Sequence, residues 1–206
     1  IGKVQVRADL QAHFTRFETA IERAQQFDTS YIRVFSFYHE GEEAGNCRDE
    51  VLAFFHRMAD CAMAAGCTLL HENESRIYGD VPERCADLIE AVNSPALRAA
   101  FDPANFVQVG VNPLDTAWPL LAQHTEYFHI KDALAATRAV VPAGYGDGGI
   151  ESILRQALEH GFDGFLSLEP HLKADDPEHG GTGAQRFAKA VTALRAVLDR
   201  IGVQAD

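Results

Sequence analysis

The chain contains no apolar run approaching 18 residues, so the sequence offers no candidate transmembrane helix. It also has few basic residues: 18 Lys and Arg stand against 30 Asp and Glu, and the formal net charge is -12. Nucleic-acid surfaces need Lys and Arg to neutralise phosphates, so this balance argues against a nucleic-acid partner. No low-complexity tract and no linker rich in Ser, Pro or Gly interrupts the sequence. We therefore expect one domain over residues 1–206, with no membrane partner.

Cysteine is scarce and its spacing is uninformative for disulfides. The four cysteines, Cys47, Cys61, Cys67 and Cys85, form no CxxC pair. We expect reduced thiols that pack as small apolar side chains in a cytoplasmic protein. No signal peptide is visible, and the start Ile-Gly-Lys-Val is not a natural initiator, so we expect a processed or shortened N-terminus.

Helical patterns alternate with short apolar runs along the whole chain. Runs of apolar, β-branched or aromatic residues predict strands at 31–38, 67–73, 96–103, 126–132 and 162–171. Helical spacing predicts helices at 13–27, 48–66, 81–92, 113–124, 148–161 and 182–201. This repeated alternation indicates an α/β fold with a parallel sheet, which is either doubly wound or closed as a TIM barrel.

Four of the predicted strands end in a residue that can bind a metal ion: Glu72, Asp102, His129 and Glu169. Successive members are 30, 27 and 40 residues apart, each close to one βα unit. In a flat sheet the four groups would spread over about 15 Å, because neighbouring strands lie about 4.8 Å apart. In a barrel the same strand ends converge on one face. A shared site therefore favours the barrel.

Three carboxylates and one imidazole suit Mn²⁺ or Mg²⁺ best, with Co²⁺ or Zn²⁺ also compatible. The competing interpretation is that each residue is a lone polar group at a strand end. Asp before Pro is common in turns, and Glu near a helix start can cap it. The recurrence of four such groups in matching positions favours the metal site.

Several neighbours of these four residues are candidates for binding a substrate. Lys131 shares a strand face with His129 and could hold a negative substrate oxygen or pair with an acid. His171 could bind substrate or lie in an exposed loop. Asn105 could reach a substrate hydroxyl or cap the following turn, and Arg33 could reach the pocket floor. Asp132 is expected to orient the ligands.

Two further features each allow two interpretations. The Gly-rich segment AGYGDGGI (143–150) precedes a helix and could hold a phosphate on its backbone N–H groups. It matches neither a dinucleotide fingerprint nor a Walker loop, so a turn capped by Asp147 is the alternative. Trp118 and Tyr145 could stack on a sugar ring or pack as core or lid.

The segments YIRVFSF, HEN, FDPAN, FHIKD, GYGDGG and LSLEPH, in this order, resemble the xylose isomerase-like TIM-barrel superfamily of sugar phosphate isomerases and epimerases. The resemblance covers nearly the whole chain. It implies that Glu72, Asp102, His129 and Glu169 bind one divalent cation. It also implies that Glu72 and Glu169 flank the substrate as an acid–base pair.

The chain departs from the pattern in two places. Ketose 3-epimerases of this family usually have a His three residues past the metal Asp, where this chain has Asn105. Their Arg shortly after the metal His is matched only by Arg138, nine residues on. The family barrel also begins with two strands that this sequence does not show, although IGKVQV resembles the tail of the second. We expect an eight-strand barrel that lacks its N-terminal βαβ segment.

The resemblance implies a metal-dependent isomerase or epimerase that acts on a sugar, sugar phosphate or related polyol ketone. The reaction would proceed by proton abstraction next to the carbonyl, through an enediolate. The partner is a small carbohydrate, and the family suggests a homo-oligomer. The alternatives are an inosose-type dehydratase on the same residues and a catalytically silent sugar-binding barrel. A phosphodiester hydrolase of the same fold is disfavoured, because that class uses several zinc ions and many histidines.

Overall fold

The computed structural model describes residues 1–39 and 43–203. The chain divides into two compact units. The first consists of Ile1–Ala100 with Gln123–Thr125, and the second consists of Phe101–Ala122 with the chain from Glu126 onward. Across the described ranges, no helix has the length and apolar character that crossing a bilayer requires.

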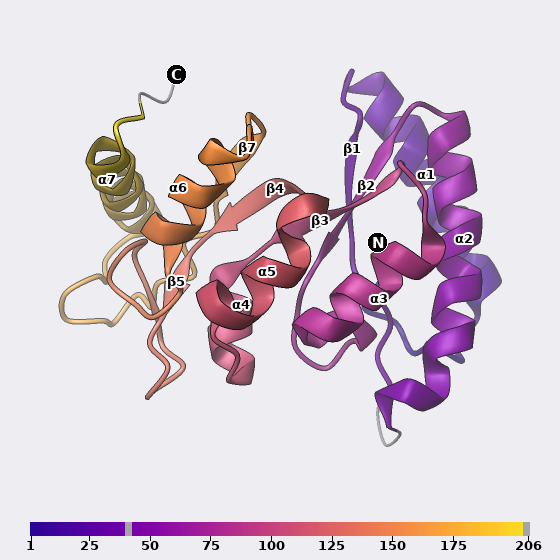
Figure 1. Ribbon diagram of the computed structural model, residues 1–206, viewed down its shortest axis with the longest axis horizontal. Coiled ribbons are helices and arrows are strands. Elements are labelled where there is room, and N and C mark those ends of the chain that lie inside the picture. Colours follow the sequence, from indigo (N-terminus) through magenta and orange to yellow (C-terminus); the bar gives the residue numbers. More distant parts are fainter. Residues whose placement is uncertain (40–42, 204–206) are drawn as a thin grey trace. The chain divides into compact units, whose positions relative to one another are not determined.

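The first unit is built on three parallel strands joined by helices (Figure 1). Its elements are α1 (Leu10–Gln26), β1 (Tyr31–Val34), the 3₁₀ turn η1 (Ala44–Cys47), α2 (Arg48–Ala64), β2 (Thr68–Glu72), the 3₁₀ turn η2 (Tyr78–Asp80), α3 (Pro82–Val92) and β3 (Leu97–Phe101). β2 pairs with β1 on one side and with β3 on the other. The helical crossovers α2 and α3 are what parallel neighbours require.

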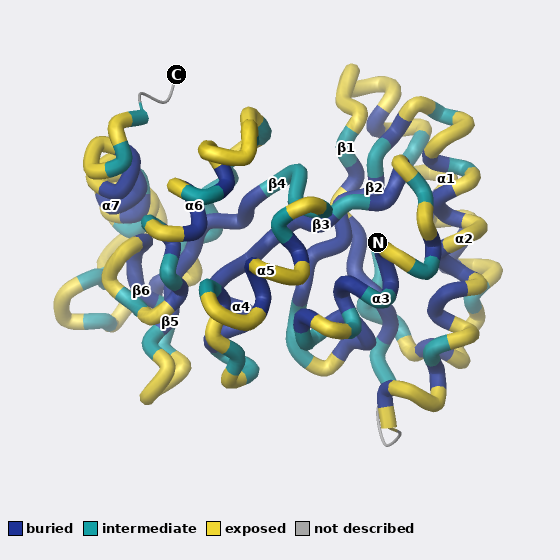
Figure 2. The backbone as a smooth tube through the Cα atoms, viewed as in Figure 1, coloured by how far each residue is buried: buried dark blue, intermediate teal, exposed yellow. Residues whose placement is uncertain are grey.

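The helices of the first unit begin and end at local sequence signals, and their apolar faces form the core. The Asp9 side chain accepts a hydrogen bond from the Ala12 N–H at 3.1 Å and so caps α1. α3 starts at Pro82 and stops at Asn93, which adopts the left-handed conformation. β2 and β3 are mostly buried, and Figure 2 shows exposed residues along the helices. Phe17 and Phe55 are among the fully buried side chains of this core.

The elements after β3 are α4 (Pro103–Val109), the π-helical turn η3 (Pro113–Ala117), α5 (Trp118–Leu121), the 3₁₀ turn η4 (Ala122–His124), β4 (Thr125–Ile130), β5 (Asp132–Ala133), β6 (Val140–Val141), α6 (Ile150–Glu159), β7 (Phe165–Leu168) and α7 (Gly183–Ile201). In the second unit β4 and β7 are parallel, and β5 and β6 form an antiparallel hairpin. Its aromatic core surrounds Phe101, whose ring centroid lies 5.3 Å from that of Phe106 and 5.5 Å from that of Trp118. Trp118 is 4% exposed and packs in this core, which is one of the two roles expected for it.

The five predicted strands and the alternation with helices are confirmed, but β1 is shorter than predicted. It ends at Val34, and residues 35–38 instead bond to the N-terminal segment. The Phe35 N–H donates to the Ile1 carbonyl at 2.7 Å, and the Tyr38 N–H donates to the Val4 carbonyl at 2.9 Å. The first half of YIRVFSF therefore pairs with β2, and the second half bonds to the N-terminal segment. The apolar pattern of the sequence could not reveal this division.

One predicted helix differs in the structure, and two elements were not predicted. The predicted helix 113–124 is broken, because Pro119 has no N–H to donate to the preceding turn. The chain takes a π-helical turn there, closed by the Trp118 N–H on the Pro113 carbonyl. Pro103 opens the unpredicted helix α4 as well as closing a strand, and the β5–β6 hairpin was not predicted.

Candidate active site

Three side chains of metal-binding type lie together in the second unit. Asp102 directly follows β3, His129 is on β4, and Glu169 directly follows β7. One ligand atom from each lies within 4.8 Å of the others. Asp102 is fully buried and His129 is 6% exposed, while the Glu169 side chain is 19% exposed. Each of the three belongs to the set that the sequence predicted.

Regular backbone structure fixes these positions. His129 is opposite Ser167 in the β4–β7 ladder, and the Glu169 N–H continues that ladder by donating to the Ile130 carbonyl at 3.1 Å. Asp102 is the N-cap of α4, and its Oδ1 accepts a hydrogen bond from the Asn105 N–H at 2.9 Å. A capping carboxylate is held in one orientation by the helix end. The ligand atoms therefore rest on elements, not on long loops.

Lys131 joins the two carboxylates of this cluster. Its Nζ lies 2.7 Å from Asp102 Oδ2 and 3.4 Å from Glu169 Oε2. The other oxygen of that glutamate, Oε1, lies 3.5 Å from His129 Nδ1. Of the two uses expected for Lys131, pairing with acids is the one that the structure displays.

The arrangement fits a single divalent cation. Such ions bind nitrogen and oxygen ligands at about 2.0–2.2 Å, so two ligands of one ion can be at most about 4.4 Å apart. The observed ligand atoms lie within 4.8 Å of one another. Side-chain adjustments of a few tenths of an ångström would bring them within the roughly 4.4 Å that one ion requires. Asp102, His129 and Glu169 could therefore hold one ion, and their hard oxygen ligands with one imidazole match Mg²⁺, Mn²⁺ or Zn²⁺.

Glu72 is the last residue of β2 in the first unit, and its side chain is 2% exposed. Its Oε2 lies 3.3 Å from a guanidinium nitrogen of Arg33 on the neighbouring strand. Arg33 is about half exposed, and its guanidinium lies over the Phe35 ring at 5.1 Å from the centroid. The structure thus shows Arg33 as a partner of a buried carboxylate.

The structure places Asn105 in the first turn of α4 and His171 in the segment after β7. Asn105 is buried in the first turn of α4, and its backbone N–H belongs to the Asp102 cap. His171 is exposed in the segment after β7, with its N–H donating to the Glu169 carbonyl at 2.8 Å.

Asp132 holds the Gly-rich segment. Its fully buried carboxylate accepts backbone hydrogen bonds from Gly144 and Gly146 at 3.0 Å each, from Gly148 at 2.8 Å and from Ala133 at 2.9 Å. Burial raises the pKa of this carboxyl above its ordinary value, and the four N–H donors oppose that rise.

The hydrogen bonds to Asp132 change the interpretation of segment 143–150. Three N–H groups expected to be available for a phosphate donate to Asp132 instead. Asp147, expected to cap the turn, accepts a hydrogen bond from the Ala135 N–H at 2.7 Å. Asp132 therefore organises the turn, a long-range role that the sequence did not indicate.

Sequence analysis also missed a buried polar residue on β2, His71. His71 is 1% exposed, and its Nε2 lies within hydrogen-bond distance of Ser36 Oγ, at 3.2 Å. Ser36 Oγ accepts a hydrogen bond from the Gly79 N–H at 2.8 Å. Burial lowers the pKa of His71 to about 3, so the imidazole is neutral. The sequence did contain a signal for it. Adjacent residues of a strand point to opposite faces, so the pattern of β2 places His71 on the face opposite to that of Glu72.

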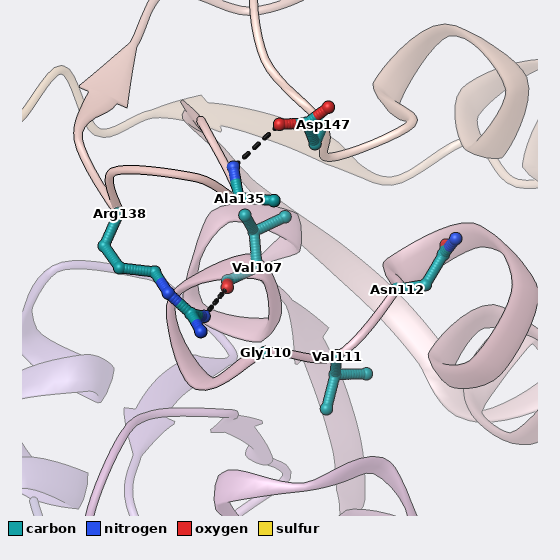
Figure 3. A pocket seen from close by; sticks show the side chains of 7 residues that line it. All are labelled: Val107, Gly110, Val111, Asn112, Ala135, Arg138 and Asp147. Atoms are coloured by element: carbon teal, nitrogen blue, oxygen red, sulfur yellow. Dashed lines mark hydrogen bonds between the residues drawn. The ribbon is translucent and has the colours of Figure 1, made fainter.

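A surface pocket of about 430 Å³ in the second unit is separate from the cluster (Figure 3). Figure 3 shows Arg138 directed at the Val107 carbonyl and Asp147 at Ala135. None of Asp102, His129 and Glu169 lines this pocket. Arg138 thus donates a hydrogen bond to the backbone near the end of α4.

Parallel strands joined by helices, with polar side chains gathered after the strands, are the pattern of a TIM-barrel α/β protein. The profile of the xylose isomerase-like TIM barrel family matches residues 6–197. The chain therefore belongs to this family. The predicted fold class and family resemblance are confirmed. No curated protein sequence matches the chain.

Solved structures of the same fold agree. A xylose isomerase domain protein from Planctomyces limnophilus superposes with a TM-score of 0.72 at 22% identity, over 93% of this chain and 66% of that one. A D-tagatose 3-epimerase-like protein gives 0.76 at 18% identity, over 95% and 73%. A xylose isomerase-like TIM barrel protein from Mycobacterium smegmatis in complex with magnesium gives 0.67 at 20%, over 91% and 68%. The chain thus spans about two thirds to three quarters of these proteins' length.

Proposed function

We propose that this protein is a divalent-metal-dependent isomerase or epimerase acting on a sugar, a sugar phosphate or a related polyol ketone. The observation that carries the proposal is the cluster of Asp102, His129 and Glu169, which offers one buried set of oxygen and nitrogen ligands. Family membership supports the substrate class. The magnesium complex of the mycobacterial relative supports a divalent ion.

Glu72 is proposed as the fourth ligand. It ends β2 in the first unit, where it is opposite Ala100, and Asp102 is two residues further along the chain from that partner. A buried carboxylate at a strand end needs a positive partner, since an unpaired buried charge is costly. Arg33 supplies part of that charge and keeps the carboxylate oriented.

The bound ion would supply Lewis acidity, which polarises a substrate carbonyl and acidifies the neighbouring C–H. The chain's glutamates then move the proton. One of the pair Glu72 and Glu169 takes the proton from that carbon as a carboxylate, and the C–H electron pair forms the C=C bond of an enediolate. The other glutamate returns a proton, taken up from solvent, to the opposite face of that enediolate. Return to the same carbon inverts it, and return to the former carbonyl carbon interconverts aldose and ketose.

The donor set ranks the metals for this proposal. Three carboxylates and one imidazole favour Mn²⁺ or Mg²⁺, and Co²⁺ or Zn²⁺ would also bind. Lys131 offsets part of the negative charge of Asp102 and Glu169, and Arg33 offsets part of that of Glu72. The expected partner is a small carbohydrate.

The test compares the wild type with Glu169→Gln, using Glu178→Gln as a matched control. Glu178 is in the same unit with a side chain 76% exposed. We expect about one divalent ion per wild-type and control chain and weaker binding in Glu169→Gln, because one charged ligand is lost. A sugar panel in D₂O with Mn²⁺ should show deuterium at the carbon next to the carbonyl for wild type and control.

Each other result has a defined meaning. Metal binding with loss of water from the substrate would identify the dehydratase alternative. Metal binding with no exchange and no product on any sugar would identify the silent sugar-binding barrel. Failure of the wild type to bind Mn²⁺, Mg²⁺, Co²⁺ or Zn²⁺ would reject the proposal.

A further inference from the structure

Lys131 is buried to an extent that is rare for lysine. It is 5% exposed and lies between β4 and β5 in the second unit. Lysine is almost never fully buried unless it is paired. Its ammonium contacts the two carboxylates that the proposed ion would use, at 2.7 Å from Asp102 and 3.4 Å from Glu169.

Burying these two carboxylates so close together has a strong electrostatic cost. Asp102 is fully buried and Glu169 is about four-fifths buried, so each has lost much of its hydration. Two like charges at short range in such surroundings repel each other and destabilise the fold. A positive group placed between them offsets both the lost hydration and the repulsion.

We propose that Lys131 is a positioning residue that acts as the internal counter-charge of the site. It holds the Asp102 and Glu169 carboxylates in place whether or not a divalent ion is bound. The inference rests on the proposed function, because it assumes that those two groups bind the ion. It assigns to Lys131 a role toward the protein's own carboxylates in place of a substrate oxygen.

The same contacts set the sign of its effect on metal affinity. Lys131 stabilises the carboxylates before the ion arrives, and its positive charge repels a cation bound to them. Both effects favour the metal-free form, so the ammonium and the ion are negatively coupled, and such coupling is reciprocal. Removing the ammonium should weaken the fold without metal and strengthen metal binding.

The test uses Lys131→Met, which removes the charge and keeps the length, and Lys131→Arg, which keeps the charge. Lys173→Met is the matched control, because Lys173 is exposed in the same unit. Each protein is freed of metal with EDTA. MnCl₂ affinity is measured by calorimetric titration, and Tm is measured with and without MnCl₂.

Lys131→Met should bind Mn²⁺ at least about fivefold more tightly than the wild type, the low end of typical coupling. Its Tm in EDTA should fall, and the rise in Tm on adding Mn²⁺ should be larger than for the wild type. Lys131→Arg and Lys173→Met should both resemble the wild type. A Lys131→Met chain that folds only with Mn²⁺ also supports the inference.

Equal or weaker Mn²⁺ binding by Lys131→Met would overturn the inference. Unchanged metal affinity with a raised KM alone would return Lys131 to substrate binding. If the Met chain does not fold with or without Mn²⁺, Lys131→Gln is judged by the same criteria. If the wild type itself binds no ion, the proposed function fails, and the Tm in EDTA alone decides whether Lys131 stabilises the two carboxylates.

Discussion

Asp132→Asn should destabilise the protein strongly although the two side chains have the same shape. The carboxylate accepts two backbone N–H groups on each oxygen: Gly148 and Ala133 on Oδ1, and Gly144 and Gly146 on Oδ2. An asparagine has one oxygen and one NH₂. In either orientation its NH₂ therefore faces two N–H donors, and both lose their acceptor.

The expected magnitude follows from those two lost acceptors. Each buried donor left unsatisfied costs about 1–3 kcal/mol, so two cost about 2–6 kcal/mol. Gly144 is exposed, so water can replace part of its bond, and we expect a loss of about 2–4 kcal/mol in the free energy of unfolding. The assay is urea unfolding, read as a fall in midpoint at unchanged slope.

Asp147→Asn is the control. Asp147 is exposed and accepts a hydrogen bond from the Ala135 N–H, which an asparagine oxygen can still accept. It should change stability by less than about 1 kcal/mol. If Asp132→Asn were as stable as this control, the four hydrogen bonds would not be what holds segment 143–150 in place.

Two further predictions concern His71, the buried polar residue on β2. Gly79→Ala should lower the free energy of unfolding by about 1–3 kcal/mol through overpacking, because a Cβ there would lie 2.3 Å from the His71 ring. A Cβ at Gly45 meets nothing within 4 Å, so Gly45→Ala is the control, and thermal unfolding should separate the two variants. His71 has a folded-state pKa of about 3 against 6.5 unfolded, so only the unfolded chain takes up its proton between these values. The contribution of His71 to stability should therefore be constant above pH 6.5 and fall by about 1.4 kcal/mol per unit as the pH drops below it. Urea titrations at pH 5 and 7.5 should show this fall in the wild type and not in His71→Leu, and equal pH slopes would contradict it.

The sequence predicted the five parallel strands because each is a short apolar run bounded by a helix signal. It predicted that Asp102, His129 and Glu169 would lie together because they follow such runs at intervals of about one βα unit. It could not predict α4 from apolar spacing, although Asp102 before Pro103 is an N-cap signature. It also missed the break at Pro119, where loss of one N–H outweighs helical periodicity.

Contacts between distant residues were the part beyond reach. The carboxylate of Asp132 binds N–H groups 12 to 16 residues further along the chain. The ammonium of Lys131 meets Asp102 and Glu169, which are 29 and 38 residues away. Local patterns carry no information on such pairings. The expectation of one domain over 1–206 and the roles of the site residues stay predictions.

The segment His129-Ile130-Lys131-Asp132 shows why the site and the Gly-rich turn should respond to mutation together. Strand alternation directs His129 and Lys131 to the cluster of carboxylates. Asp132, the next residue, anchors segment 143–150 through its fully buried carboxylate. A change that releases this anchor frees the backbone directly after Lys131. Because that ammonium is 2.7 Å from Asp102, even a small backbone shift would weaken the ion pair. Asp132→Asn should therefore alter Mn²⁺ affinity in the same direction as Lys131→Met but by less, whereas Asp147→Asn should leave it unchanged.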